Sequence, residues 1–165
     1  MTSLREMCFD DLFKINSLAF DSLTEMYSLT FFAKHLLEFP ELSQIAIAPG
    51  PEGSRMGYIF GVYHLPKNKI MYGHVASLTV SPAYRRIGVA TTLMDYFDKI
   101  LDFKGANYVD LYMRISNKAA YKLYCSLGYA LRGTAKDYYP DQPNPEDAYE
   151  MRKYFPRPLE VQAVG

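Results

Sequence analysis

The chain is poor in the residues that build disulfide frameworks and metal clusters. Among its 165 residues there are only two cysteines, Cys8 and Cys125, and three histidines, His35, His64 and His74. Two cysteines far apart in the sequence, each flanked by apolar residues, are typical of free thiols in a reducing compartment and argue against a disulfide framework. The histidines form no spaced cluster with the cysteines, so we expect no metal site.

Charge of one sign and long apolar runs are also lacking. Eighteen basic and eighteen acidic side chains give a formal net charge of zero. This balance gives no reason to expect nucleic acid or an anionic membrane as a partner. No stretch approaches the roughly 20 apolar residues that cross a bilayer, and residues 1–6 lack the apolar core of a signal peptide. We therefore expect a cytoplasmic protein with no membrane segment.

Length and composition favour one domain with a full core. The chain is 49% hydrophobic and 15% aromatic, which suffices for a single core at 165 residues but not comfortably for two. We expect the domain to span residues 1–155. Residues 156–165 have no periodicity and are expected to fray as a flexible tail.

Patterns along the chain predict a mixed α/β domain. Strand-like runs occur at residues 4–8, 44–48, 56–63, 74–80, 108–113, 129–134 and 149–154. One-sided apolar spacing and end signals predict helices at residues 30–39, 88–103 and 118–127, and a first helix capped by Asp10 and Asp11. The strands at 74–80 and 108–113 are joined through a helix, so we expect them to be parallel.

The most informative run lies between a strand and a helix. It consists of Arg85, Arg86, Ile87, Gly88, Val89 and Ala90. Gly88 lets a ligand approach the backbone closely, and the unpaired amides from Arg86 to Thr91 make a positive helix start suited to a pyrophosphate. The alternative is an ordinary strand-to-helix turn with two solvated arginines.

The pattern Arg-x-x-Gly-x-Ala resembles the acyl-coenzyme-A loop of the GCN5-related N-acetyltransferases, the GNAT superfamily. The resemblance implies one GNAT-fold domain with about four helices and a mostly antiparallel sheet of about seven strands, whose parallel central pair splays apart. It implies that acetyl-CoA binds there and leaves as CoA, its diphosphate held by Arg85, Arg86, Ile87, Gly88, Val89, Ala90 and Thr91. Backbone groups near Leu78 and Val80 are expected to hold the pantetheine arm.

Further segments resemble the catalytic subunits of the NatB N-terminal acetyltransferases, from residue 4 to about residue 153. Matching pieces lie at residues 10–13, 23–27, 73–75, 85–88, 109–111, 116–117, 127–129, 138–139 and 146–149. The chain departs from that family at Ala76, where a threonine is frequent, and at Ser22, where a proline is frequent. The resemblance implies direct transfer of acetyl to the α-amine of proteins that begin Met-Asp, Met-Glu, Met-Asn or Met-Gln.

This chemistry needs a proton donor for the leaving thiolate, and Tyr124 is the candidate. It lies seven residues after Asn117, so both side chains leave the same helix face about 10 Å apart. Asn117 is placed toward the pantetheine and Tyr124 toward the sulfur. The alternatives are a core aromatic at Tyr124 and a simple helix cap at Asn117.

The peptide side of the site is expected on a strand and two loops. His74 and Ala76 share a strand face, and an imidazole at His74 suits an acidic or amide second side chain. The alternative for His74 is a structural histidine at a strand end. The resemblance makes four further residues walls of the peptide entrance: Glu25, Tyr27, Tyr138 and Tyr139. The general base stays open between Glu25, His74, Tyr138 and an ordered water.

The resemblance also implies a partner. A helical-repeat auxiliary subunit of NatB would anchor this chain at the ribosome, where nascent protein N-termini are the substrates. Phe31, Phe32 and Leu36 are candidate contacts, with ordinary core packing as the alternative. Two other functions remain open: a GNAT enzyme that acts on lysine or a small amine, and a noncatalytic acyl-CoA-binding subunit.

Overall fold

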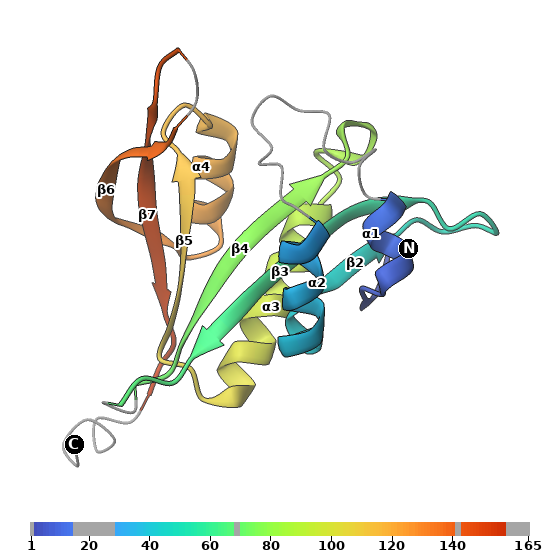
Figure 1. The fold of residues 1–165 in the computed structure, drawn as a ribbon, viewed down its shortest axis with the longest axis horizontal. Coiled ribbons are helices and arrows are strands. Elements are labelled where there is room, and N and C mark those ends of the chain that lie inside the picture. The colour runs from blue at the N-terminus through green and yellow to red at the C-terminus, as the bar shows by residue number, and fades with distance from the viewer. Residues whose placement is uncertain (1, 15–28, 68–69, 141–142, 158–165) are drawn as a thin grey trace. The chain divides into compact units, whose positions relative to one another are not determined.

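The computed structural model describes residues 2–14, 29–67, 70–140 and 143–157 (Figure 1). Two predicted site residues, Glu25 and Tyr27, lie outside them, as does Ser22. The strands are β1 (Ser3–Glu6), β2 (Gln44–Ile47), β3 (Arg55–His64), β4 (Tyr72–Val80), β5 (Tyr108–Arg114), β6 (Ala130–Tyr139) and β7 (Glu146–Tyr154). The helices are α1 (Phe9–Lys14), α2 (Leu29–Glu38), α3 (Val89–Lys104) and α4 (Lys118–Ser126), with short 3-10 turns η2 (Pro40–Leu42) and η3 (Pro82–Tyr84).

The order of elements and the mixed sheet are those predicted. The strands form a seven-stranded sheet in the order β1-β2-β3-β4-β5-β7-β6. The pairs β1–β2, β2–β3, β5–β7 and β6–β7 are antiparallel. The neighbours β4 and β5 are joined through α3 and are parallel, as the sequence indicated. No helix within the described ranges is both long and apolar enough to cross a membrane.

Contacts along the chain divide it into two units, which are described separately. The first unit comprises residues 1–62 and 75–100, and the second comprises residues 63–74 and 101–165. Strand β4 therefore contributes residues 72–74 to the second unit and residues 75–80 to the first.

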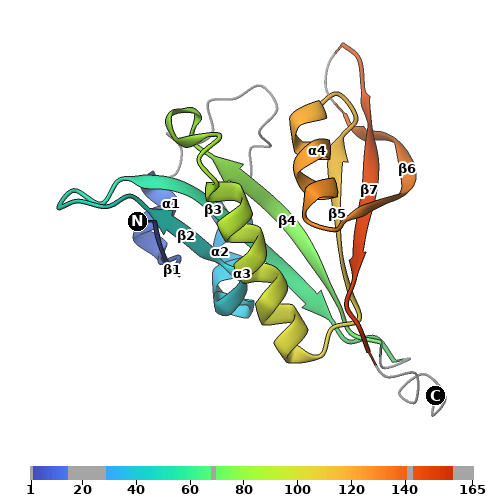
Figure 2. The same ribbon diagram turned by 180° about the vertical axis from the view of Figure 1, so that it is seen from behind.

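The first unit has helices on both faces of its strands. Helices α1 and α2 lie on one face of β2 and β3, and α3 lies on the other (Figures 1 and 2). A buried cluster forms between α1, α2 and the strands, and its members are Met7, Leu12, Phe32, Leu36, Ile45, Tyr58 and Phe60. Phe32 and Leu36 were candidate partner contacts; both are core residues, because they lie on the α2 face turned toward β3. Phe31 is 36% exposed and contacts Phe60 edge-on.

The start of α1 differs from the prediction. Helix α1 begins at Phe9, so Asp10 and Asp11 lie inside its first turn and do not precede it. The Asp11 carboxylate accepts a hydrogen bond from the Cys8 backbone N–H at 2.9 Å, and the Asp11 N–H donates to the Cys8 carbonyl at 3.0 Å. Cys8 therefore stands at the capping position, and Asp11 satisfies its amide from within the helix.

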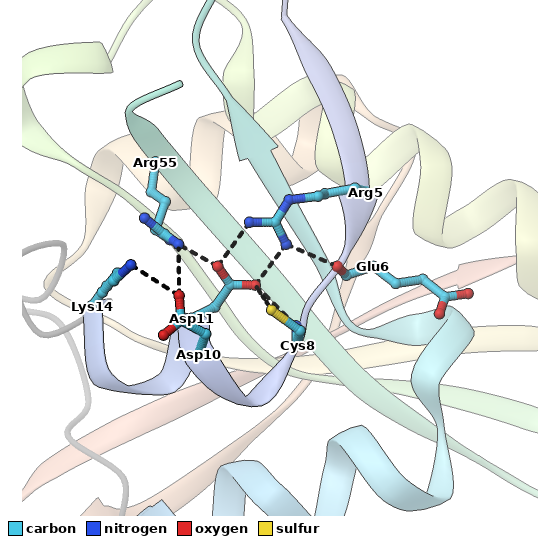
Figure 3. Close-up of polar contacts among 7 residues, drawn as sticks. All are labelled: Arg5, Glu6, Cys8, Asp10, Asp11, Lys14 and Arg55. Carbon is cyan, nitrogen blue, oxygen red and sulfur yellow. Dashed lines mark hydrogen bonds and ion pairs between the residues drawn. The ribbon is translucent and has the colours of Figure 1, made fainter. Parts of the chain in front are cut away.

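A buried carboxylate ties α1 to β1 and β3 (Figure 3). The Asp11 side chain has no exposed area; it accepts hydrogen bonds from Arg5 at 2.7 and 2.9 Å and from Arg55 at 2.8 Å. Burial favours the neutral acid, but the hydrogen bonds from the two guanidinium groups and from Cys8 outweigh it. They hold the pKa of Asp11 well below its usual range.

The second unit packs α4 against one face of β5 and β7 (Figure 2). Its core residues include Val109, Leu111 and Met151, none more than 1% exposed. Asn117 caps α4 as predicted, and Gly128 follows the helix with a φ of 95°. These two residues mark the start and the end of α4, which follows β5 and precedes β6 along the chain.

Strand β6 is longer than predicted, and this moves two site residues. Tyr138 and Tyr139 were expected in a loop, but both lie on β6, where Tyr139 pairs with Glu146 of β7. The register of β6 shifts between Ala135 and Tyr139, and Asp137 there has a φ of 52°. The irregularity explains why the sequence pattern predicted a strand that ends before it, although β6 pairs with β7 again at Tyr139.

Candidate functional site

The turn between β4 and α3 has the strand–turn–helix context that the sequence predicted. Arg86 and Gly88 both have positive φ values, of 66° and 87°. The left-handed region favours glycine at Gly88 and imposes strain at Arg86. A Cβ on Gly88 would meet no atom within 4 Å, so its conformation, and not crowding, requires glycine.

Unpaired amides gather in this turn. The first intrahelical hydrogen bond of α3 runs from the Thr92 N–H to the Gly88 carbonyl at 3.0 Å. Among the residues that the structure describes, the N–H groups from Arg86 to Thr91 therefore have no backbone acceptor. Gly88 is exposed, which leaves these donors open to solvent or to an anion.

The two arginines of the turn differ in their contacts. The Arg85 Nε donates to the Val80 carbonyl at 3.1 Å and so links the turn to the end of β4. Arg86 and Ile87 are exposed, Ile87 by 66%. Unpaired amides, an exposed glycine and two cations fit the diphosphate of acetyl-CoA, which is the group that the resemblance implies here.

The β4 residues of the first unit follow the predicted alternation. Ala76, Leu78 and Val80 are half-buried, whereas Val75 and Thr79 are 5% and 6% exposed. Ala76 packs against the buried cluster of that unit. A pantetheine role for Leu78 and Val80, and a peptide role for Ala76, stay predictions.

Asn117 in the second unit is a helix cap. Its side-chain oxygen accepts a hydrogen bond from the Ala120 N–H at 3.2 Å. The cap uses the oxygen and leaves the side-chain NH₂ group for other partners. The alternative that the sequence left open for Asn117 is thus confirmed, and the cofactor role stays a prediction compatible with it.

Tyr124 is the one residue of α4 classed as buried. It is 8% exposed, and its ring lies 6.0 Å from that of Tyr129. Burial raises the pKa of Tyr124 to about 12. Within the described part of the chain its hydroxyl has no hydrogen-bond partner. The side chain therefore keeps its proton at neutral pH and has a donor to offer.

His74 pairs with an acidic residue that the sequence analysis did not select. Its Nδ1 lies 2.7 Å from Oδ1 of Asp110 on β5, and the two side chains are 27% and 11% exposed. The ring of Tyr112 lies 5.9 Å from the imidazole. Both partners of His74 come from one face of β5, and strand alternation alone could have grouped them.

An aromatic series continues from this pair. Tyr112 stacks on Tyr138 at 4.7 Å, and Tyr138 meets Tyr139 edge-on at 5.0 Å. The guanidinium of Arg114 lies 4.2 Å from the centre of the Tyr139 ring and 3.2 Å from the Glu146 carboxylate. Tyr138 is 46% exposed, and burial raises the pKa of Tyr112. The structure thus brings His74, Tyr138 and Tyr139 into one connected row.

The described residues contain no group of side chains arranged as metal ligands. Within the described ranges, no three His, Cys, Asp or Glu side chains lie together as metal ligands would. Cys8 and Cys125 are free thiols, both exposed.

The chain is similar to known proteins over most of its length. The model of the acetyltransferase (GNAT) family matches residues 10–129. N-alpha-acetyltransferase 20 of Dictyostelium discoideum is 37% identical over an alignment of 168 positions, which covers 99% of this chain and 92% of the relative. N-terminal acetyltransferase B complex catalytic subunit NAA20 of Arabidopsis thaliana is 36% identical, over 99% of this chain and 91% of the relative. A chain in a crystal structure of the NatB acetyltransferase complex bound to CoA and MES has a TM-score of 0.83 and 29% identity, covering 93% of this chain and 99% of that one.

Proposed function

Because the chain belongs to the acetyltransferase (GNAT) family, and within it to the NAA20 catalytic subunits of N-terminal acetyltransferase B, we propose that it acetylates protein N-termini. The expected substrates begin Met-Asp, Met-Glu, Met-Asn or Met-Gln. The observation that carries the proposal is the turn before α3, where the N–H groups from Arg86 to Thr91 have no backbone acceptor among the described residues.

The residues of the turn would hold acetyl-CoA, which when bound supplies an acetyl group activated as a thioester. The amides from Arg86 to Thr91, with the Arg85 and Arg86 side chains, suit its diphosphate. Backbone groups near Leu78 and Val80 are proposed to hold the pantetheine arm, and the NH₂ group of Asn117 to bind it as well.

The chain must also manage two protons. An α-amine has an ordinary pKa of about 8, so part of it is neutral near pH 7 and the rest must lose a proton. Glu25, directly or through water, is the proposed proton acceptor, and His74 is the alternative acceptor where its ring is neutral. Tyr124 stays protonated at neutral pH, since burial raises its pKa to about 12, and its hydroxyl is proposed to donate a hydrogen bond to the leaving sulfur and to keep its own proton.

The peptide end is proposed to lie along the row of aromatic side chains. His74 offers its Nε2 edge to the second side chain, while Tyr138 and Tyr139 form one wall. Glu25 and Tyr27 are proposed as further walls of the peptide entrance, and Ala76 as a further substrate-binding residue.

The partner is proposed to be a helical-repeat auxiliary subunit that makes a heterodimer with this chain and places it at the cytoplasmic ribosome. The similarity to a chain of the NatB complex supports this assembly. Phe32 and Leu36 are not available for it because they are core residues. Two other apolar side chains are exposed and are the proposed contacts: Phe13 on α1 by 69% and Leu37 on α2 by 71%.

The test is an acetylation assay with peptides that differ only at their first or second residue. The full chain, co-purified with its auxiliary subunit, receives acetyl-CoA and peptides beginning Met-Asp, Met-Asn, Met-Lys or Ser-Asp. We expect product from the first two only. Product from a peptide with a blocked N-terminus would show lysine acetylation instead, and CoA binding without product from any amine would show a noncatalytic subunit.

A further inference from the structure

The contact between His74 and Asp110 determines which imidazole nitrogen is left to bind another group. Nδ1 lies 2.7 Å from the Asp110 carboxylate, which is 11% exposed. An ionised carboxylate only accepts hydrogen bonds, so Nδ1 must carry the proton in this contact. Nε2 is the remaining nitrogen, and within the described ranges it has no hydrogen-bond partner.

With a proton fixed on Nδ1, the hydrogen-bonding role of Nε2 depends only on whether the ring is neutral or charged. In a neutral ring Nε2 is an acceptor, and in a doubly protonated ring it is a donor with a positive charge. An Asp or Glu side chain of a peptide can only accept, so it needs the charged ring. An Asn or Gln side chain also carries an NH₂ donor, so it can bind the neutral ring.

We propose that Asp110 is a positioning residue that holds His74 in the Nδ1–H form, and that it thereby supports acidic second residues more strongly than amide ones. The inference rests on the proposed function, since it assigns His74 to the second side chain. The negative charge of Asp110 offsets the imidazolium that an acidic peptide requires. An amide peptide does not require that charge.

The surroundings of the pair restrict how the ring can move. The Tyr112 ring lies 5.9 Å from the imidazole and is itself stacked on Tyr138 at 4.7 Å. Asp110 lies on β5, which pairs with β7 over its whole length, Asp110 opposite Arg152. The carboxylate is therefore presented from a paired strand, as a positioning group needs.

The first test compares peptide classes in Asp110→Asn, which keeps the size of the side chain and removes its charge. We expect kcat/KM for Met-Asp peptides to fall about tenfold more than for Met-Asn peptides, with the KM for acetyl-CoA unchanged. Asp102→Asn is the matched control, because its carboxylate pairs with Arg157 at 2.8 Å and has no contact with His74. An equal loss for both peptide classes would overturn the proposal.

A second variant separates positioning from folding. If Asp110 acts through His74, Asp110→Asn should change the peptide ratio in the wild-type chain and not in a His74→Ala background. The same loss in both backgrounds would assign Asp110 a structural role only. Thermal melting of each variant shows whether the chain is folded when its kinetics are measured.

The tautomer can be measured without any turnover. Nitrogen-15 shifts of the His74 ring at alkaline pH should show Nδ1 protonated in the wild-type chain and a mixture of tautomers in Asp110→Leu. A wild-type ring protonated on Nε2 would overturn the pairing. Absence of product from all peptides would overturn the proposed function, whereas the ring shifts judge the His74–Asp110 contact by themselves.

Discussion

Two buried side chains of this protein differ in whether their polar atoms form hydrogen bonds. Asp11 is a buried charge satisfied by Arg5 and Arg55, whereas Tyr124 is a buried side chain whose hydroxyl has no hydrogen-bond partner among the described residues. The first contributes to stability, because its hydrogen bonds exist only in the folded chain. The second contributes little to stability and is available for chemistry.

Replacing Asp11 by asparagine should destabilise the chain by about 3 kcal/mol, because two guanidinium groups lose the negative charge that they share and one of its two acceptor oxygens. Urea unfolding of the two proteins at neutral pH measures this difference. Asp10→Asn is the control, since the Asp10 side chain is 64% exposed and its ion pair with Lys14 is a surface pair. Equal midpoints for wild type and Asp11→Asn would contradict the assigned role.

The depressed pKa of Asp11 also predicts acid sensitivity. A carboxyl group whose pKa is lower in the folded chain stabilises it above the unfolded value, about pH 4, and loses that contribution as the pH falls further. Stability should therefore drop below about pH 4, and Asp11→Asn should lack most of this drop. Denaturant midpoints measured from pH 7 down to pH 3 give both curves; parallel curves would contradict the prediction.

Removing the Tyr124 hydroxyl should affect chemistry and not folding. In Tyr124→Phe we expect kcat to fall about 100-fold, because the leaving sulfur loses its donor. The KM for acetyl-CoA and the melting temperature should change little, since no described residue forms a hydrogen bond with the hydroxyl. Steady-state kinetics and a thermal melt measure these quantities. An unchanged kcat would make Tyr124 a core aromatic only.

At the scale of elements, the helix start after β4 is the most consequential local structure. Its amides are unpaired because α3 begins at Val89 and the first internal hydrogen bond comes from Thr92. Gly88 permits the turn that presents them. The same conformation occurs at Gly105, with a φ of 92° and no atom within 4 Å of an added Cβ, far along the chain at the end of α3.

These two glycines make a matched pair of variants. Gly88→Ala and Gly105→Ala should each cost about 1 kcal/mol of stability from the positive φ. Only Gly88→Ala should also raise the KM for acetyl-CoA, by about tenfold, because its turn presents the amides to the diphosphate. Kinetics with varied acetyl-CoA separate the two. Equal KM values would show that the turn does not bind the cofactor.

Sequence patterns predicted the elements well where local chemistry fixes them. Gly88 and Asn117 mark a turn and a helix start, and each lies where expected. The end of β6 was missed because Asp137 interrupts the strand pattern, and only pairing with β7 shows that the strand continues.

The contacts among the candidate site residues could be predicted only in part, for the same reason. Asn117, Tyr124 and His74 were selected by spacing and resemblance. Asp110 and Tyr112 were not, because their importance comes from a neighbour on another strand, and a sequence read along one chain does not show which strands meet.

At the scale of the whole molecule, similarity runs through almost the entire chain, and both units carry parts of the proposed chemistry. The first unit holds the turn for the diphosphate, and the second holds Tyr124, His74 and the aromatic row. The formal net charge of zero gives no general attraction for acidic or basic partners. We therefore propose that selectivity comes from placed side chains such as His74.

The central claim is that this chain transfers acetyl to an α-amine. One peptide beginning Met-Asp and containing an internal lysine offers both kinds of amine at equal concentration. After incubation with acetyl-CoA and the full chain with its auxiliary subunit, fragmentation mass spectrometry locates the acetyl group. We expect it on the N-terminal methionine alone. Acetyl on the lysine side chain, with a free N-terminus, would contradict the claim.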